Sequence, residues 1–269
     1  MLEAGCRWLR SYVATTRNEK GQQLAAYRLV TYVARAFAPK VLSEVTGDDI
    51  RQFRLVLEQY HRLSPHTVTH VLSDLRCLLR WAVSEGVIER SPFPARVMPR
   101  IAEAVPRGFS DLEVALLMAV PGRVGFVLRL LLGTGLRWAE SCRVTRDDVR
   151  GVLLEVSNTK SGRVRRVPLV AALRDEVLGC AGPLNPFAMG SPGSFSRTVR
   201  RVSGILGFHA HRCRHTFAMR WLEAGGNLAV LQQILGHRDL STTMRYARVT
   251  DELIEREAKR VERRRGREE

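Results

Sequence analysis

Cysteine is scarce and unpatterned in this chain of 269 residues. Its five cysteines are odd in number, and no two of them form a C-x-x-C pair. Disulfide scaffolds of secreted proteins and zinc ribbons need paired or closely spaced cysteines, so both classes are disfavoured. A reducing cytoplasm is the expected location.

Long hydrophobic runs are also missing. The most apolar stretch, VGFVLRLLLG at residues 124–133, is too short to span a bilayer and contains Arg129. The first residues lack the charged segment and apolar run of a signal peptide. We expect a buried helix at 124–133, no signal peptide and no membrane association.

Acidic residues are outnumbered. Against 43 lysines and arginines stand 27 aspartates and glutamates, which gives a net charge of +16 and an isoelectric point near 10.8. Residues 1–100 and residues 101–269 both carry a basic excess, so a basic tail alone does not produce it. This balance indicates a polyanionic partner, above all double-stranded DNA.

Helical patterns fill the first part of the chain. In residues 64–86 apolar side chains recur at helical spacing between a capping serine and a terminal glycine. Residues 24–37 and 46–60 show a similar period. We predict a helical bundle over residues 1–90.

Prolines are concentrated in residues 91–107, which contain four of the eleven in the chain. Such a density breaks helices and stiffens a connection, so we predict a domain linker here. Residues 149–169 contain two β-rich runs around the turn signal NTKSG, which predicts a hairpin, and helical patterns return from about residue 173. The predicted fold is mainly α with a small β-hairpin or sheet, and residues 108–269 form its α+β second domain.

Tyrosine is nearly absent from that second domain. Four of the five tyrosines lie in the first sixty residues, and Tyr246 is the only one after Tyr60. A lone tyrosine is most often an ordinary aromatic residue, but tyrosine is also a covalent nucleophile in some enzymes. Tyr246 follows His237 by nine residues, beyond a glycine that suits a helix end and a segment that can cap a short helix. The residues around it decide between the two interpretations.

Two arginines of the second half stand where an anion could bind. Arg137 follows an apolar helix and a Gly-Thr-Gly break, and Arg214 shares a predicted helical face with His211. The planar fork of arginine matches two phosphate oxygens, and two such forks can neutralise charge that develops on a phosphorus under attack. Guanidinium and imidazole groups nearby also help a phenol to ionise. These residues predict a phosphodiester site.

Lysine is scarce, with four residues against 39 arginines. Lys160 stands at the predicted tip of the hairpin. Lysine can be tuned to give up a proton, which arginine cannot, so Lys160 is a candidate general acid. An ordinary exposed turn lysine is the alternative interpretation.

A zinc site is the competing interpretation of HAHRCRHTF, residues 209–217. His211 and His215 have the i, i+4 spacing of zinc-protease helices. However, Arg212 replaces the glutamate that such a motif needs, and its charge would repel a dication. No carboxylate cluster suggests a two-metal nuclease either. We expect no metal and no other cofactor.

Four segments follow one another along the second half of the chain: GTGLRWAE (133–140), TKSGRVRRVPL (159–169), HAHRCRHTF (209–217) and LGHRDLSTTMRY (235–246). Together they resemble the motif boxes of the tyrosine recombinases, the family of phage integrases and Xer-type resolvases. The resemblance covers about residues 107–250, and the helical first half is less specifically similar to the family's core-binding domain. It implies site-specific recombination of DNA, with strand exchange through a Holliday junction.

The resemblance also implies a reaction. Tyr246 would attack the phosphorus and form a 3′-phosphotyrosyl link, with His211 as its base or hydrogen-bond partner. Lys160 would protonate the departing 5′-oxygen. Because the link retains the energy of the phosphodiester, rejoining needs neither ATP nor a metal.

Further matching residues would hold the phosphate. The resemblance implies that Arg137 and Arg214 clamp it, that His237 bonds to one of its oxygens, and that Glu140 supports the site from behind. The last residues resemble the family's exchange helix, expected around Asp251–Arg260, which packs on a neighbouring subunit in a homotetramer on DNA.

Two other functions compete with recombination. A type IB topoisomerase uses a closely similar residue set but works as a monomer. A DNA-binding protein could keep the fold and lose the chemistry, although the intact six-residue set argues against it. The DNA target cannot be read from the sequence, because groove contacts and DNA deformability determine it.

Overall fold

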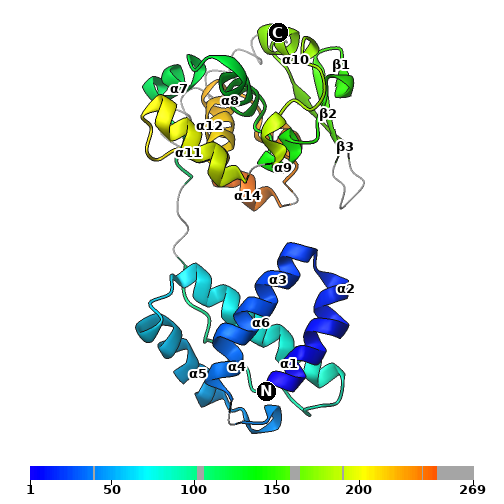
Figure 1. The fold of residues 1–269 in the computed structure, drawn as a ribbon, viewed down its shortest axis with the longest axis vertical. Helices are drawn as coiled ribbons and strands as arrows, with labels where there is room; N and C mark the ends of the chain where they lie inside the picture. The colour runs from blue at the N-terminus through cyan, green and yellow to red at the C-terminus, as the bar shows by residue number, and fades with distance from the viewer. Residues whose placement is uncertain (39, 102–105, 158–163, 190, 238, 247–269) are drawn as a thin grey trace, which may run out of the picture. The chain divides into compact units, whose positions relative to one another are not determined.

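The computed structural model describes residues 1–269 apart from 39, 102–105, 158–163, 190, 238 and 247–269. The chain divides into two compact units, unit 1 (Met1–Glu103) and unit 2 (Ala104–Glu269), drawn in Figure 1. The division lies within the proline-rich segment. The predicted fold class is confirmed, since the described residues are mostly helical with one small sheet.

Unit 1 is a bundle of helices, three of which continue through a π-helical turn. In chain order its elements are α1 (Leu2–Trp8), η1 (Leu9–Val13), α2 (Ala14–Thr16), α3 (Glu19–Arg28), η2 (Leu29–Val33), α4 (Ala34–Ala36), η3 (Leu42–Glu44), α5 (Gly47–Leu55), η4 (Val56–Tyr60) and α6 (Pro65–Ser84).

Helix α6 is the long helix predicted from residues 64–86. The hydroxyl of Ser64 accepts a hydrogen bond from the backbone N–H of Thr67, and Pro65 occupies the first helical position. Its buried face packs in the core of unit 1. Its buried Asp74 binds two arginines, Arg17 at 2.7 Å from the segment after α2 and Arg28 of α3 at 2.6 Å. These charge-assisted bonds tie three segments of the bundle together.

Unit 2 combines helices with an antiparallel sheet. Its elements are α7 (Asp111–Met118), α8 (Gly122–Thr134), α9 (Trp138–Ser141), η5 (Arg146–Asp148), β1 (Val149–Arg150), β2 (Leu153–Ser157), β3 (Val164–Pro168), α10 (Ala171–Leu178), η6 (Pro186–Met189), α11 (Pro192–Ser203), α12 (Ala210–Glu223), α13 (Leu228–Leu235) and α14 (Leu240–Met244). In Figure 1, α8 and α12 lie among the other helices, and the sheet lies at one edge beside α10.

Helix α8 is the buried helix predicted from residues 124–133. Arg129, its one charged residue in that stretch, reaches outward to Glu176 of α10, with 2.7 Å between Nη2 and Oε2. Gly135 ends the helix in the left-handed conformation at φ 63°. A Cβ at this glycine would lie 2.6 Å from Phe217, so close packing also requires glycine here. Within the described residues, no helix combines the length and apolar character needed to cross a membrane.

The predicted hairpin is confirmed as β2 and β3, with β1 on the outer side of β2. In the β2–β3 register Val156 is opposite Arg165. Leu154 and Val156 of β2 and Val167 of β3 are buried, and Arg165 shares the face of Val167 because side chains two apart in a strand point the same way. This face of the sheet therefore directs one arginine inward.

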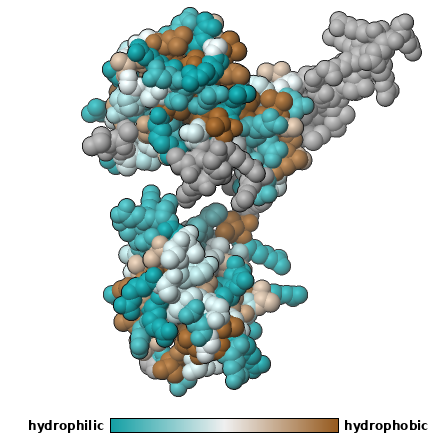
Figure 2. Space-filling model, turned by 90° about the vertical axis from the view of Figure 1, so that its right-hand side faces the viewer, coloured by the Kyte–Doolittle hydropathy of each residue, from teal (hydrophilic) through white to brown (hydrophobic). Residues whose placement is uncertain are grey.

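Hydrophilic residues cover much of the face drawn in Figure 2, with hydrophobic patches scattered between them. The predicted tip of the hairpin, with Lys160, and the predicted exchange helix both lie outside the described residues.

Candidate active site

Among the described residues of unit 2, Arg214 is the most buried charged residue, with 1% of its surface exposed. It lies on α12, and two main-chain carbonyls orient its guanidinium. Nη1 donates to the oxygen of Gly135 at 2.8 Å, and Nη2 donates to the oxygen of Leu235 at 2.6 Å. Burial, reinforced by the charge of Arg137, lowers the pKa of Arg214 to about 9, so it stays charged at neutral pH.

Glu140 forms the acidic support of the site. Two nitrogens of Arg165 donate to its two carboxylate oxygens at 2.9 and 2.8 Å. Arg137 donates to it twice, from Nη1 at 2.9 Å and from its backbone N–H at 2.7 Å. Despite burial, which opposes ionisation, hydrogen bonds and charge from Arg165 and Arg137 lower the pKa of Glu140 to about 2.

Arg137 and Arg165 both bind this carboxylate, but their side chains differ in solvent exposure. Arg137 caps the short helix α9, and 40% of its side chain is exposed. The side chain of Arg165 is 11% exposed, and its Nε also donates to the backbone oxygen of Ile234 at 2.7 Å. Arg165 is thus held inside the protein, whereas the guanidinium of Arg137 is partly exposed to solvent.

Tyr246 lies two residues past the end of α14, and its phenol is half-buried against residues of α12 and α13. Its oxygen is 2.7 Å from Nδ1 of His215. Burial raises the pKa of Tyr246, while the charges of Arg214, Arg245 and Arg137 act in the opposite direction. The phenol is therefore protonated at neutral pH and lies within the field of several arginines.

His237 stands just past the left-handed Gly236 that ends α13. Its Nδ1 is 2.8 Å from the hydroxyl of the buried Thr243, and its ring stacks on Tyr246 with 6.5 Å between centroids and 12° between planes. Burial, together with Arg214 and Arg137, lowers the pKa of His237 to about 4. A neutral imidazole thus faces the phenol ring.

His211 is placed differently from the expectation that it would contact the phenol. It lies one helical turn before His215 on α12 and packs edge-on against that ring, with centroids 4.7 Å apart. Burial and then the charge of Arg214 lower the pKa of His211. Among the described residues, the imidazole that contacts the tyrosine oxygen is that of His215.

The structure therefore brings six of the seven candidate residues into one neighbourhood: Arg137, Glu140, His211, Arg214, His237 and Tyr246. The seventh, Lys160, lies outside the described residues. Two residues were missed as members of the site. Arg165 could have been found from strand alternation, and His215 was noticed only for its metal-like spacing from His211.

The grouped histidines and cysteine do not converge. Cys213 is fully buried in the core of unit 2, and burial raises the pKa of its thiol to about 12. Nδ1 of His209 accepts the backbone N–H of Arg212 and caps α12. Among the residues that the structure describes, no group of three potential ligands is arranged to hold a metal ion.

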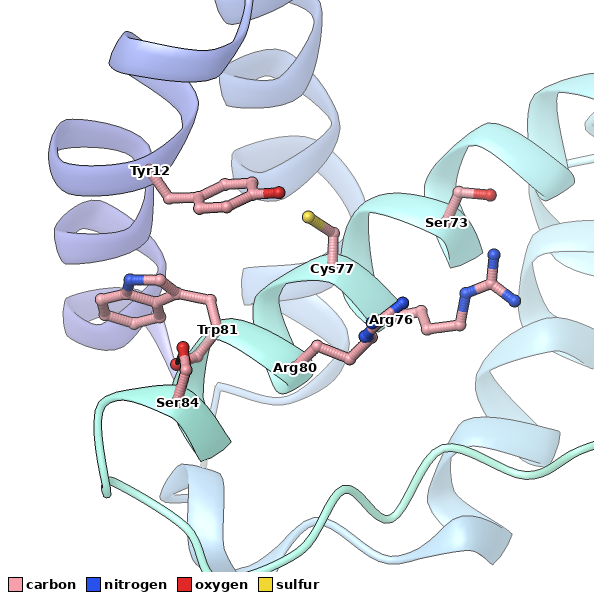
Figure 3. A pocket seen from close by; sticks show the side chains of 7 residues that line it. All are labelled: Tyr12, Ser73, Arg76, Cys77, Arg80, Trp81 and Ser84. Atoms are coloured by element: carbon pink, nitrogen blue, oxygen red, sulfur yellow. Dashed lines mark hydrogen bonds between the residues drawn. The ribbon is translucent and has the colours of Figure 1, made fainter.

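A second basic feature lies in unit 1, where α6 and η1 line a groove of about 370 Å³. Figure 3 shows Tyr12 across from Cys77 and Trp81, with Arg76 and Arg80 along the same helix. The guanidinium of Arg76 also lies 5.9 Å from the ring centroid of Phe93. The groove contains basic and aromatic groups without an obvious acid–base pair, which favours binding over chemistry.

Comparisons with known sequences place this geometry in context. A model of the Phage integrase family matches residues 190–252. The Tyrosine recombinase XerC of Rhodospirillum centenum is 30% identical over 287 residues, covering 93% of this chain and 83% of that protein. The Tyrosine recombinase XerC of Bacillus subtilis is 28% identical over 244 residues, covering 78% and 79%.

Solved structures share the fold. A lambda integrase dimer bound to a COC′ core site matches with a TM-score of 0.74 at 19% identity, covering 93% of this chain and 79% of that one. The Tn1549 transposon Integrase in complex with circular intermediate DNA matches with a TM-score of 0.72 at 20% identity, covering 95% and 98%.

Proposed function

Because this chain belongs to the tyrosine recombinase family, it is an enzyme that breaks and rejoins DNA at specific sites, and we propose that Tyr246 is its nucleophile. One observation carries this assignment. The phenol of Tyr246 contacts His215 and lies within the electrostatic reach of Arg214 and Arg137. Among the five tyrosines, it is the one surrounded by groups suited to a phosphodiester.

In the proposed reaction the oxygen of Tyr246 attacks the scissile phosphorus as its O–H bond breaks and releases the proton to solvent. The bond from phosphorus to the 5′-oxygen then breaks, which leaves a 3′-phosphotyrosyl link and a free 5′-hydroxyl. In the reverse reaction another 5′-hydroxyl attacks the phosphotyrosyl link, which rejoins the strand and releases Tyr246. One phosphate ester replaces another at each step, so no external energy source enters the balance.

Two arginines stabilise the charge on phosphorus in this scheme. The carbonyls of Gly135 and Leu235 fix the direction of Arg214, and Glu140 fixes that of Arg137. Donors that are already oriented stabilise a transition state without reorganising during the reaction. Removal of one such donor from an enzyme costs about 10²–10³ in rate.

Two further residues complete the proposal. The hydroxyl of Thr243 can donate to Nδ1 of His237, which leaves the proton of the neutral ring on Nε2 for a phosphate oxygen. Lys160, assigned from its place in the sequence motif, supplies a proton to the departing 5′-oxygen. Glu140 touches both Arg137 and Arg165 and positions the former without contacting DNA.

We also propose that unit 1 is the core-binding domain and that both units grip one duplex in a homotetramer located in the cytoplasm. The net charge of +16 supports a DNA partner, and the groove with Arg76 and Arg80 offers phosphate contacts. A type IB topoisomerase is the alternative, and the relatives that match this chain do not favour it.

Detection of the covalent intermediate tests the proposal. The protein is incubated with fragmented genomic DNA of its host, denatured, and analysed for DNA that stays attached to protein. The wild type and a Tyr60→Phe control, which alters a tyrosine of unit 1 that is 81% exposed, should both form the adduct. Tyr246→Phe should form none while retaining binding that weakens steeply with salt.

Each other outcome has a definite meaning. An adduct that survives Tyr246→Phe would show that another residue is the nucleophile. Relaxation of a supercoiled plasmid that lacks any sequence recovered in the adduct would support the topoisomerase. Sequencing of the attached DNA would identify the target site.

A further inference from the structure

The proposed reaction gives no role to His215, although this residue contacts the oxygen of Tyr246. Nδ1 of His215 and the phenol oxygen are 2.7 Å apart, and the two rings are tilted by 49° with centroids 5.6 Å apart. This is the distance of a well-formed hydrogen bond that involves a hydroxyl. The residues are 31 positions apart in the chain, so the fold alone brings them together.

The protonation states of the two groups restrict the direction of this bond. Burial lowers the pKa of His215 to about 4, and the charges of His211, His209 and Arg214 act in the same sense. Burial raises the pKa of Tyr246. At neutral pH a neutral imidazole therefore faces a protonated phenol, and in the tautomer with its proton on Nε2 the phenol O–H donates and Nδ1 accepts.

The surroundings of the two rings leave the phenol little freedom. His215 is on α12 directly after Arg214, whose guanidinium is anchored by two main-chain carbonyls. His211 packs edge-on against the His215 ring, and His237 stacks on the phenol. The nucleophile is thus held at its oxygen by one imidazole and along its ring by another.

We propose that His215, rather than His211, is the residue that orients the nucleophile of this enzyme. Its Nδ1 holds the Tyr246 oxygen in position and directs the O–H bond before attack. This inference rests on the proposed role of Tyr246. Misplacement of a reacting atom by about 1 Å can cost about 10²-fold in rate, which sets the scale of the expected effect.

A pair of substitutions separates orientation from proton transfer and from simple packing. His215→Asn places an amide oxygen near the position of Nδ1, so it can accept the phenol hydrogen bond but has no basicity. His215→Leu fills similar space without any acceptor. Circular dichroism and DNA binding identify a variant that has lost its fold. His209→Asn, which keeps a side-chain oxygen to cap α12, is the matched control on the same helix.

The assay is single-turnover cleavage of a nicked duplex that carries the target sequence recovered from the adduct, with excess enzyme. We expect His215→Leu to cleave about 10- to 100-fold more slowly than the wild type at unchanged DNA affinity. His215→Asn should stay within about fivefold, because hydrogen-bond acceptance alone positions the phenol. His215→Leu as fast as the wild type, or His215→Asn as slow as His215→Leu, would overturn the proposal.

A second substrate checks which step is affected. Sulfur in place of the bridging 5′-oxygen makes a leaving group that needs no proton. The defect of His215→Leu should persist on this duplex, because attack still needs an oriented phenol, and recovery to the wild-type rate would overturn the proposal. Failure of the wild type to form an adduct through Tyr246 would instead contradict the proposed function itself.

Discussion

Replacement of Glu140 by glutamine tests whether one buried carboxylate supports the arginines of the site. In the wild type, this carboxylate accepts two hydrogen bonds from Arg165 and two from Arg137. Glutamine keeps the shape but loses the charge, and one of its two oxygen positions becomes an NH₂ donor. Arg165 would then be left in the interior without its carboxylate, and Arg137 would lose an anchor.

Two independent estimates of the stability cost agree. The pKa of Glu140 falls from an ordinary 4.5 to about 2 in the folded protein, and a shift of this size corresponds to about 3 kcal/mol of stability at pH 7. Removal of one partner from a buried ion pair typically costs about 3–5 kcal/mol. We expect Glu140→Gln to lose about 3 kcal/mol of unfolding free energy at pH 7.

The stability difference between the wild type and Glu140→Gln should depend on pH in a definite direction. The folded-state pKa of Glu140 lies below its unfolded value, so the stabilisation is fully present above about pH 4.5 and is lost as pH falls through about 2. The difference between wild type and Glu140→Gln should therefore shrink to about 2 kcal/mol at pH 3.5. It should continue to fall below that pH.

Urea denaturation of the full-length protein, followed by tryptophan fluorescence at several pH values, measures this difference. Hydrogen exchange of peptides around α9 and β3 assigns the change to unit 2. Glu155→Gln is the matched control, because Glu155 pairs with Arg166 on the same sheet but the side chain of Arg166 is 67% exposed. Such a pair contributes about 0–1 kcal/mol. Equal losses for the two variants, or a Glu140→Gln difference independent of pH, would refute the reasoning.

Two further substitutions test the remaining geometry. Arg214→Lys keeps a charge but loses the fork held by two carbonyls, so cleavage in the adduct assay should fall about 100-fold or more; cleavage within tenfold of the wild type would contradict this. Gly236→Ala strains a residue at φ 66° and places its Cβ 2.9 Å from Cδ of Arg165, so by thermal unfolding it should cost more than the control Gly151→Ala. The control shares the strain of about 1–2 kcal/mol at φ 63° but has open space around it, and equal costs would show that the contact is harmless.

Local patterns were enough to predict much of the fold. The cap at Ser64, the buried stretch at 124–133 and the hairpin are each determined by residues close together in sequence, and each is present in the structure. The motif boxes also placed Tyr246 and the two catalytic arginine candidates in one half of the chain. Their approach in space agrees with that grouping.

Contacts between distant segments could not be predicted in the same way. The family resemblance pointed to His211. The sequence could not distinguish it from His215, one turn further on, because the partner of Tyr246 depends on how the segment after α14 packs against α12. Arg165 was overlooked because it acts through two bonds to distant segments, one to Glu140 and one to the backbone oxygen of Ile234 at the end of α13. Strand alternation places Arg165 on the buried face of the sheet, but its bond to Glu140 and the contact of Tyr246 with His215 depend on how distant segments pack.

The glycines in the motif boxes have a physical role that links the sequence to the arginines. A helix end leaves its last carbonyls without partners inside the helix. Helix α8 ends at the left-handed Gly135, whose own oxygen accepts from Arg214, and α13 ends at the left-handed Gly236, just after the carbonyl of Leu235 that accepts from the same guanidinium. Arg165 takes the carbonyl of Ile234 in the same turn. Two helix termini thus orient the guanidinium groups, and the glycines permit the turns that bring those termini together.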